Sequence, residues 1–229
     1  MNYLTPHPNI LKIFDCFEDN YFSYIVLELC QTNDLSERIK QGGPLSEPLV
    51  ACLVKNLLEA IEHCHENGVA HRDIKPENVL IDFNGNIKLG NFGFSEWFIK
   101  EGIKKSMIGV VGTPSYSAPE VVFGKECYNE KVDIWSCGVT LYVMLTGIMS
   151  FVGETNDEIV KKILKTDMRF PEEKSEYVSS SAIDLIRMMV CREPSFRISA
   201  KQALMHPWIV KGGMIKDYHV IDVFDLVPH

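Results

Sequence analysis

Apolar residues recur every three or four positions in several stretches of this sequence, a spacing that predicts amphipathic helices. The longest such stretch follows Ser46, which can cap a helix, has Pro48 where the first turn would lie, and ends at Asn67-Gly68. Its apolar stripe consists of Leu49, Leu53, Leu57 and Ile61. We therefore predict a helix from about Ser46 to Asn67 with one buried face.

Shorter patterns predict further helices. The segment Ile134 to Leu145 is apolar nearly all round, which is typical of a helix buried on every side, and it is too short to span a bilayer. Ser181-Ala182-Ile183-Asp184 has the form of a capping box and opens another helix. Short helices are also expected at 34–40, 155–165 and 199–205.

Two pairs of short apolar runs predict β-hairpins. Ile10 to Phe17 and Tyr24 to Leu29 are rich in strand-forming residues and are joined by a polar turn. Val79-Leu80-Ile81 and Ile87-Lys88-Leu89 flank a turn that contains Asn-Gly. A long irregular segment follows at 91–120, and loops of this length are usually functional. Together with the helices, these runs predict an α+β domain.

The composition is that of an ordinary soluble globular protein, since 46% of the 229 residues are hydrophobic and 24% are charged. A net charge of −8 argues against nucleic acid or an anionic membrane as the main partner. The seven cysteines are scattered without a C-x-x-C pair and no signal-peptide pattern is visible. We therefore expect reduced thiols in a cytosolic or nuclear compartment, with the cytoplasm as the expected location. His63 and His65 do not share a helix face, and we interpret them as ordinary helix residues rather than metal ligands.

The most informative stretch is His71-Arg72-Asp73-Ile74-Lys75-Pro76-Glu77-Asn78, between the long predicted helix and a short apolar run. It places a carboxylate, a lysine and an amide at fixed spacing, with a proline that stiffens the turn. One interpretation is a polar loop that matches a motif by chance. The other is the catalytic loop of a protein kinase, because the stretch resembles the signature H-R-D-L-x-x-x-N with only Leu replaced by Ile.

This resemblance implies a role for each polar residue of the loop. Asp73 would accept the proton of a substrate serine or threonine hydroxyl, and Lys75 would neutralise charge on the transferring phosphoryl group. Asn78 would offer an amide oxygen to Mg²⁺. His71 and Arg72 would be structural or regulatory residues of the same loop. ATP and Mg²⁺ are the cofactors that the resemblance implies.

Further motifs extend the resemblance from about His7 to Trp208. Asn91-Phe92-Gly93 stands at the D-F-G position and Ala118-Pro119-Glu120 at the A-P-E position. The family pattern implies that Thr113 hydrogen-bonds Asp73. The structural or regulatory residues that it implies are Phe92, Gly93, Asp133 (which would hold the catalytic-loop backbone), and Arg197 paired with Glu120. The ATP-binding residues that it implies are Leu27 as gatekeeper, Glu28 and Cys30 in the hinge, Asp34 near the ribose, and Leu80 under the adenine.

Several short stretches of the sequence also resemble one subfamily of protein kinases. Leu29-Cys30-Gln31, Val69-Ala70-His71 and the run from Ser106 to Thr113 look like plant phosphoenolpyruvate carboxylase kinase, which is similar to the calcium/calmodulin-dependent kinases. The resemblance implies a protein substrate, phosphoenolpyruvate carboxylase. No calmodulin-target helix or EF-hand loop is visible after Trp208. Gly109 stands where many kinases carry an activating phosphothreonine, which implies no phosphorylation there and leaves Ser106 as the alternative.

Asn91 departs from the family pattern, which has an aspartate that binds Mg²⁺ at this position. An amide brings an oxygen but no charge, so we expect weaker metal binding at Asn78 and Asn91. A loss of about 4 kcal/mol would slow phosphoryl transfer roughly a thousandfold. The alternative is that asparagine is a tolerated near-isostere of aspartate.

The printed sequence shows no Gly-rich loop, V-A-I-K lysine or glutamate-bearing helix before the first hairpin. We therefore expect a kinase-like fold with a remnant hairpin and hinge at 1–33, a helical C-terminal lobe at 34–208 and a tail at 209–229. The tail is open to interpretation as a strand, a partner-binding segment or a loose terminus. The expected function is that of an impaired serine/threonine kinase, and the alternatives are a pseudokinase that acts as a regulatory binding module and a truncated gene product.

Overall fold

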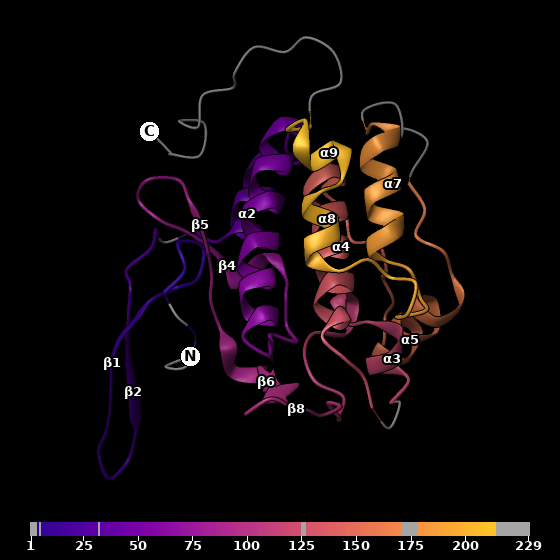
Figure 1. Ribbon diagram of the computed structural model, residues 1–229. Helices are drawn as coiled ribbons and strands as arrows, with labels where there is room; N and C mark the ends of the chain where they lie inside the picture. The colour runs from indigo at the N-terminus through magenta and orange to yellow at the C-terminus, as the bar shows by residue number, and fades with distance from the viewer. Residues whose placement is uncertain (1–3, 5, 32, 125–126, 171–177, 214–229) are drawn as a thin grey trace.

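The computed structural model describes residues 4, 6–31, 33–124, 127–170 and 178–213. Within them, a body of packed helices carries short two-stranded sheets along one side and at its lower end (Figure 1). This mixture of helices and small sheets confirms the predicted α+β class. The catalytic-loop stretch lies where the helical body meets these sheets.

The long helix α2 (Glu47–Glu66) forms one wall of the body and packs against α4 (Lys131–Thr146) and α8 (Ala200–Leu204). The prediction of this helix is confirmed. Of its predicted apolar stripe, Leu53, Leu57 and Ile61 are buried and Leu49 is partly buried. Ser46 occupies the N-cap position as predicted, but its side chain makes no capping hydrogen bond.

Helix α4 is the centre of the core, as its apolar pattern predicted. Every residue from Val132 to Thr146 is buried. Gly138 lets α7 (Ser180–Met189) approach closely, because a Cβ there would lie 2.8 Å from the Cβ of Met189. A side chain at position 138 would therefore push the two helices apart.

Helix α7 begins earlier than the capping box at Ser181 predicted. Ser179 is the N-cap, and its Oγ accepts a hydrogen bond from the backbone N–H of Ala182. Glu47 stabilises the start of α7, because its carboxylate accepts hydrogen bonds from the backbone N–H and the hydroxyl of Ser179. The same carboxylate accepts the indole N–H of Trp208 at 2.6 Å, in α9 (Pro207–Val210).

The short helices predicted at 34–40 and 155–165 are present as α1 (Leu35–Gly42) and α5 (Asn156–Lys165). Helix α3 (Pro119–Val122) was not predicted and begins at the end of the segment expected to be irregular. Asp34 caps α1 by accepting a hydrogen bond from Glu37 N–H, and α8 starts with a capping box formed by Ser199 and Gln202.

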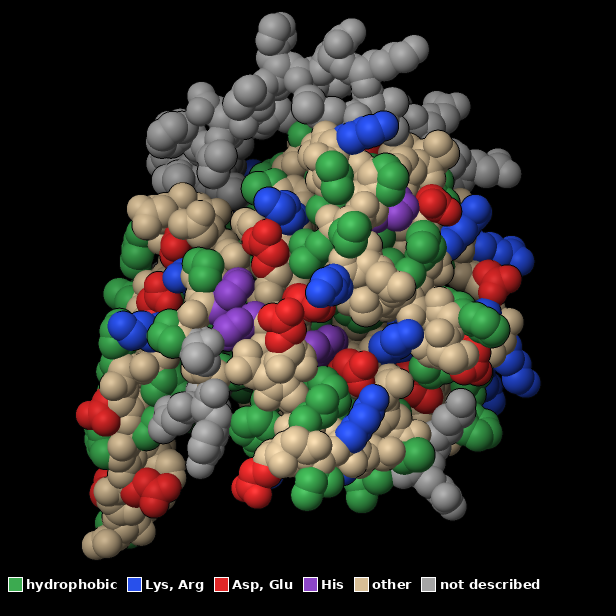
Figure 2. Space-filling view, in the orientation of Figure 1, with side chains coloured by type: hydrophobic (Ala, Val, Ile, Leu, Met, Phe, Trp, Pro, Cys, Tyr) green, Lys and Arg blue, Asp and Glu red, His purple; other side chains and the backbone are tan. Residues whose placement is uncertain are grey.

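The first predicted hairpin is formed by β1 (Ile13–Glu18) and β2 (Ser23–Leu27), which pair antiparallel. Its first strand is shorter than predicted, because Ile10 and Leu11 pair with Leu89 instead. The hairpin stands away from the helical body (Figures 1 and 2). Its large apolar side chains are exposed, among them Phe14, Phe17, Tyr21, Phe22, Tyr24 and Ile25.

The second predicted hairpin is also present, as β4 (Val79–Ile81) and β5 (Ile87–Leu89). Asp82 shapes its turn, since the Oδ1 atom accepts hydrogen bonds from the backbone of Asn84 and Asn86.

The segment predicted to be irregular, 91–120, contains short elements of its own. Strand β6 (Glu96–Trp97) pairs with β3 (Val69–Ala70). Strands β7 (Ile99–Lys100) and β8 (Ile103–Lys104) pair with each other.

All seven cysteines lie among the described residues, and each is a free thiol. No helix in the described ranges has the length and apolar character needed to cross a membrane. Ile209, at the start of the predicted tail, is buried in α9, whereas residues 214–229 lie outside the described residues.

Candidate active site

The backbone of the catalytic loop is held by Asp133 of α4. The carboxylate accepts hydrogen bonds from the backbone N–H of His71 at 2.8 Å and of Arg72 at 2.7 Å, and it contacts His65 Nε2 at 2.9 Å. Burial raises the pKa of the Asp133 carboxyl, but the hydrogen bonds and electrostatic attraction of His65 and His71 together outweigh burial, so the pKa lies below its usual value. Arg72 has a φ of 67°, in the left-handed region, and the bonds to Asp133 hold this strained geometry.

His71 joins the loop to Gly90, the residue that follows β5. Its Nδ1 accepts a hydrogen bond from Asp73 N–H at 3.2 Å, so Nε2 carries the proton and donates to the carbonyl of Gly90 at 2.9 Å. Burial lowers the pKa of His71, which agrees with this neutral tautomer. The imidazole also packs edge-on against Phe92 with ring centres 4.7 Å apart.

Asp73 lies at the centre of a cluster of polar side chains. Thr113 Oγ1 donates a hydrogen bond to Asp73 Oδ1 at 2.9 Å, and Lys75 Nζ lies 3.2 Å from Asp73 Oδ2. Lys75 also donates to Thr113 Oγ1 at 2.6 Å, which turns the threonine hydroxyl hydrogen toward Asp73. The structure thus brings together three residues that the resemblance placed in the catalytic machinery, although they lie up to 40 positions apart.

A chain of side-chain amides completes the cluster. Asn78 Nδ2 donates to the carbonyl oxygen of Asp73 at 2.6 Å and to its Oδ2 at 2.9 Å. Asn91 Nδ2 donates in turn to Asn78 Oδ1 at 3.0 Å. Asn78 is buried, whereas Asn91 is exposed and has a φ of 57°.

This donor set does not fit the Mg²⁺ ion that the resemblance implies. The amide oxygen of Asn78 accepts a hydrogen bond from the amide of Asn91, and neither residue carries a negative charge. The one carboxylate of the cluster, Asp73, is already paired with Lys75. Across the described ranges, no group of three or more His, Cys, Asp or Glu side chains could hold a metal ion.

The residues that the resemblance assigns to ATP contact strands β4 and β5, which adjoin Asn78 and Asn91 along the chain. Glu28 pairs with Lys88 of β5 at 2.8 Å, and the Asp34 backbone bridges to Leu80. Leu27, at the end of β2, is 42% exposed, and Cys30 is partly buried. Asp34 already serves as the cap of α1. The interactions described link these residues to β4 and β5 rather than to Asp73.

Arg72 ties the loop to the segment 94–109. Its guanidinium donates to the carbonyl oxygen of Phe94 at 2.6 Å, to that of Ile108 at 3.3 Å, and to the hydroxyl of Tyr128 at 3.0 Å. The Tyr128 hydroxyl lies 2.9 Å from the carbonyl oxygen of Gly109. The acceptors of these three hydrogen bonds are all neutral oxygens.

Sequence reasoning missed two positioning residues, His65 and Tyr128. His65 was interpreted as an ordinary helix residue, and nothing in the local pattern links it to Asp133, 68 positions away. Tyr128 lies outside the motifs, and its approach to Arg72 depends on the path of the chain between them.

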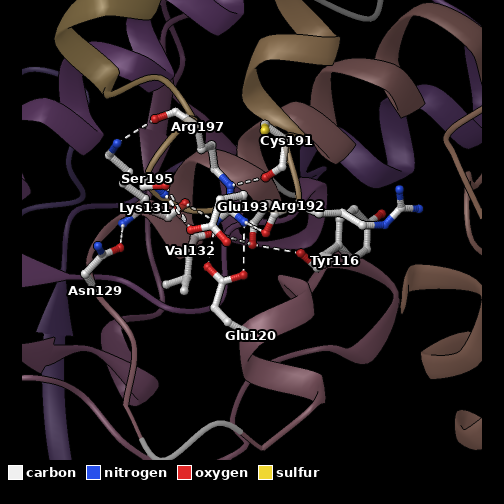
Figure 3. A network of polar contacts seen from close by, with 11 residues as sticks. Tyr116, Glu120, Asn129, Lys131, Val132, Cys191, Arg192, Glu193, Ser195 and Arg197 are labelled. Carbon is white, nitrogen blue, oxygen red and sulfur yellow. Dashed lines mark hydrogen bonds and ion pairs between the residues drawn. The ribbon is translucent and has the colours of Figure 1, made fainter. Parts of the chain in front are cut away.

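The expected pair of Glu120 and Arg197 is present, within the network of polar contacts that Figure 3 shows. The two side chains form parallel hydrogen bonds of 2.7 and 3.0 Å, and both are almost fully buried. Arg197 also donates to the carbonyl oxygens of Cys191 and Lys131, and its guanidinium lies 5.3 Å from the ring centre of Trp135. This network joins α3, the start of α4 and the segment after α7.

Comparison with known proteins identifies relatives along nearly the whole chain. The profile of the protein kinase domain matches residues 1–209. Calcium-dependent protein kinase 4 of Arabidopsis thaliana is 43% identical over 213 residues, covering 92% of this chain and 42% of the relative. Calcium-dependent protein kinase 24 of Oryza sativa subsp. japonica is 41% identical over 220 residues, covering 95% and 42%.

A third relative, the serine/threonine-protein kinase PEPKR2 of Arabidopsis thaliana, is 40% identical over 210 residues, covering 92% of this chain and 44% of the relative. The chain spans about two fifths of the length of these relatives.

Proposed function

Because this chain belongs to the protein kinase family, we propose that its catalytic loop presents Asp73 to a serine or threonine hydroxyl of a cytoplasmic protein and transfers the γ-phosphoryl group of ATP to it slowly. The acceptor to which the sequence resemblance points is phosphoenolpyruvate carboxylase. Relatives named as serine/threonine and calcium-dependent kinases support the class of reaction.

The observation that carries this proposal is the hydroxyl contact of Asp73. Thr113 donates its hydroxyl hydrogen to Asp73 Oδ1, in the way that an acceptor serine or threonine would. When the substrate oxygen attacks phosphorus, its proton passes to Asp73, and the bond from the γ-phosphorus to the bridging oxygen of ATP breaks. Lys75, beside the carboxylate, is positioned to stabilise the negative charge of the transferring group.

The slow rate follows from Asn91. Protein kinases use ATP with Mg²⁺, and an aspartate of the D-F-G motif is one of the metal ligands. Here the corresponding side chain is a neutral amide that donates a hydrogen bond instead of offering a charge. A loss of about 4 kcal/mol in transition-state stabilisation corresponds to roughly a thousandfold lower rate.

The test is a transfer assay with radiolabelled ATP and Mg²⁺, with the carboxylase and a general serine/threonine peptide as acceptors. We expect Asn91→Asp to raise the rate by up to roughly a thousandfold over the unmodified chain. The double variant Asn91→Asp, Asp73→Asn is the control and should lose this gain, because the base is gone. An Asn91→Asp protein that is no faster, or a double variant that keeps the gain, would contradict the proposal.

A second candidate function is a binding module that transfers no phosphate. The closed amide chain favours it, since Asn91 leaves the cluster with no free carboxylate for a cation. This candidate predicts that the unmodified chain and Asn91→Asp both bind the carboxylase, measured by calorimetry, while neither transfers phosphate. Phosphoryl transfer by the Asn91→Asp protein would contradict this candidate function.

A further inference from the structure

The hydrogen bonds among Asp73, Asn78 and Asn91 can run in only one direction. The carboxylate and carbonyl oxygens of Asp73 accept hydrogen bonds, so Asn78 must turn its NH₂ group toward them. Both hydrogens of that group are then used, and the amide oxygen faces the other way. Asn91 meets this oxygen with its own NH₂ group at 3.0 Å. The charge of Asp73 therefore sets the orientation of both amides.

An aspartate at position 91 could not close the same chain. Its carboxylate oxygens would face the amide oxygen of Asn78, and two acceptors attract each other only through a hydrogen or a cation between them. The backbone conformation at position 91 does not favour asparagine over aspartate. A φ of 57° is a left-handed value that asparagine and aspartate both adopt more readily than most residues.

We infer that the Asn91 amide takes the place of a divalent cation at this site and holds Asn78, and through it Asp73, in position without metal. The positive end of the amide dipole lies where a carboxylate at position 91 would require a positive ion. The role of Asp73 toward a substrate rests on the proposed function, but the hydrogen-bond chain does not. The geometry of the site should consequently be insensitive to Mg²⁺.

The experiment uses Mn²⁺ alone, which broadens NMR signals of nearby groups, with the unmodified chain, Asn91→Asp and Asn91→Gly. The readout is the side-chain NH₂ signal of Asn78, and that of Asn67, which donates to the carbonyl of His63, serves as a reference in the same spectrum. Glycine removes the amide and tolerates the positive φ without strain.

In the unmodified chain, we expect the Asn78 signal to broaden no more than that of Asn67. In Asn91→Asp, the Asn78 signal should broaden at roughly a tenth of the Mn²⁺ concentration that broadens it in the unmodified chain, because a carboxylate adds the charge that an amide lacks. In Asn91→Gly, the hydrogens of the Asn78 amide should exchange faster with solvent, and Mn²⁺ should not restore their protection, since glycine supplies no ligand.

Equal broadening in the unmodified chain and Asn91→Asp would overturn the inference, as would no broadening in either. Unchanged exchange in Asn91→Gly would overturn it independently, even if the aspartate variant did not fold. The outcomes separate this inference from the proposed function. Mn²⁺ binding by Asn91→Asp without phosphoryl transfer would reject the function alone, and faster transfer without any change at Asn78 would reject the inference alone.

Discussion

Two groups of buried carboxylates near the catalytic loop differ in how tightly their partners are enclosed. In the first, which we call the inner region, Asp133 accepts two backbone N–H groups, and Glu120 is paired with the fully buried side chain of Arg197. In the second, the outer region, Asp73 is bonded by side chains, those of Thr113 and Lys75 among them, and the side chain of Lys75 is 19% exposed. Backbone groups and a fully buried arginine cannot leave without unfolding the surrounding structure, whereas a partly exposed side chain can turn away when a ligand arrives. We therefore interpret the inner region as structural and expect the outer region to be suited to binding.

Loss of Arg197 should produce the largest effect and would separate the two regions most clearly. Arg197→Ala leaves the carboxylate of Glu120 buried without a partner and removes three bonds to backbone carbonyls. Breaking a buried pair in this way costs about 3–5 kcal/mol. We expect the free energy of unfolding, measured in urea, to fall by this amount.

The matched control is Lys40→Ala, which removes an exposed ion pair with Glu37 whose side chains are 64% and 45% exposed. Its cost should stay below about 1 kcal/mol, because solvent screens such pairs. Similar costs for the two variants would show that the inner network is not the structural region.

A pH titration of stability tests the neutral state of His71. Burial lowers its pKa below 6.5 in the folded protein, so between the unfolded and folded values the unfolded chain binds more protons. The stabilisation is complete above pH 6.5 and is lost as the pH falls below it. One proton corresponds to a slope of at most about 1.4 kcal/mol per pH unit.

The comparison is with His71→Asn, which cannot titrate. Its free energy of unfolding should be lower overall but should change less between pH 7.5 and 5.5. The pKa of His7 is also lowered by burial, but His7 is present in both proteins and cancels in the difference. Parallel pH profiles would mean that His71 is not held neutral.

The smallest expected effect is that of Tyr128→Phe, which probes the tie between the loop and the segment 107–110. The change removes one hydroxyl that contacts Arg72 and Gly109, and it should cost about 1 kcal/mol. Amide hydrogen exchange in this segment should become faster.

Tyr142→Phe is the control, because its hydroxyl bonds Arg169 far along the chain from the loop. It should cost a similar amount and leave exchange at 107–110 unchanged. If both variants loosened the segment equally, Tyr128 would have no specific positioning role.

Local patterns in the sequence predicted much of the helical body and the second hairpin. The stripe in α2 and the apolar run in α4 depend on spacing within a single segment, so they are visible without knowing the fold. The ends of elements were less predictable. Helix α7 begins at Ser180 rather than at the capping box because Glu47, 132 positions away from Ser179, binds that cap.

By itself, the sequence determined the fold class, the catalytic-loop motif and the replacement of an aspartate by Asn91. Only the tertiary structure decided how these residues face one another. The roles of His65 and Tyr128, and the direction of the amide chain from Asn91 through Asn78 to Asp73, arise from contacts between different segments of the chain. A hydrogen bond has a donor and an acceptor at defined positions in space, and residue spacing along the chain carries no information about which of them will meet.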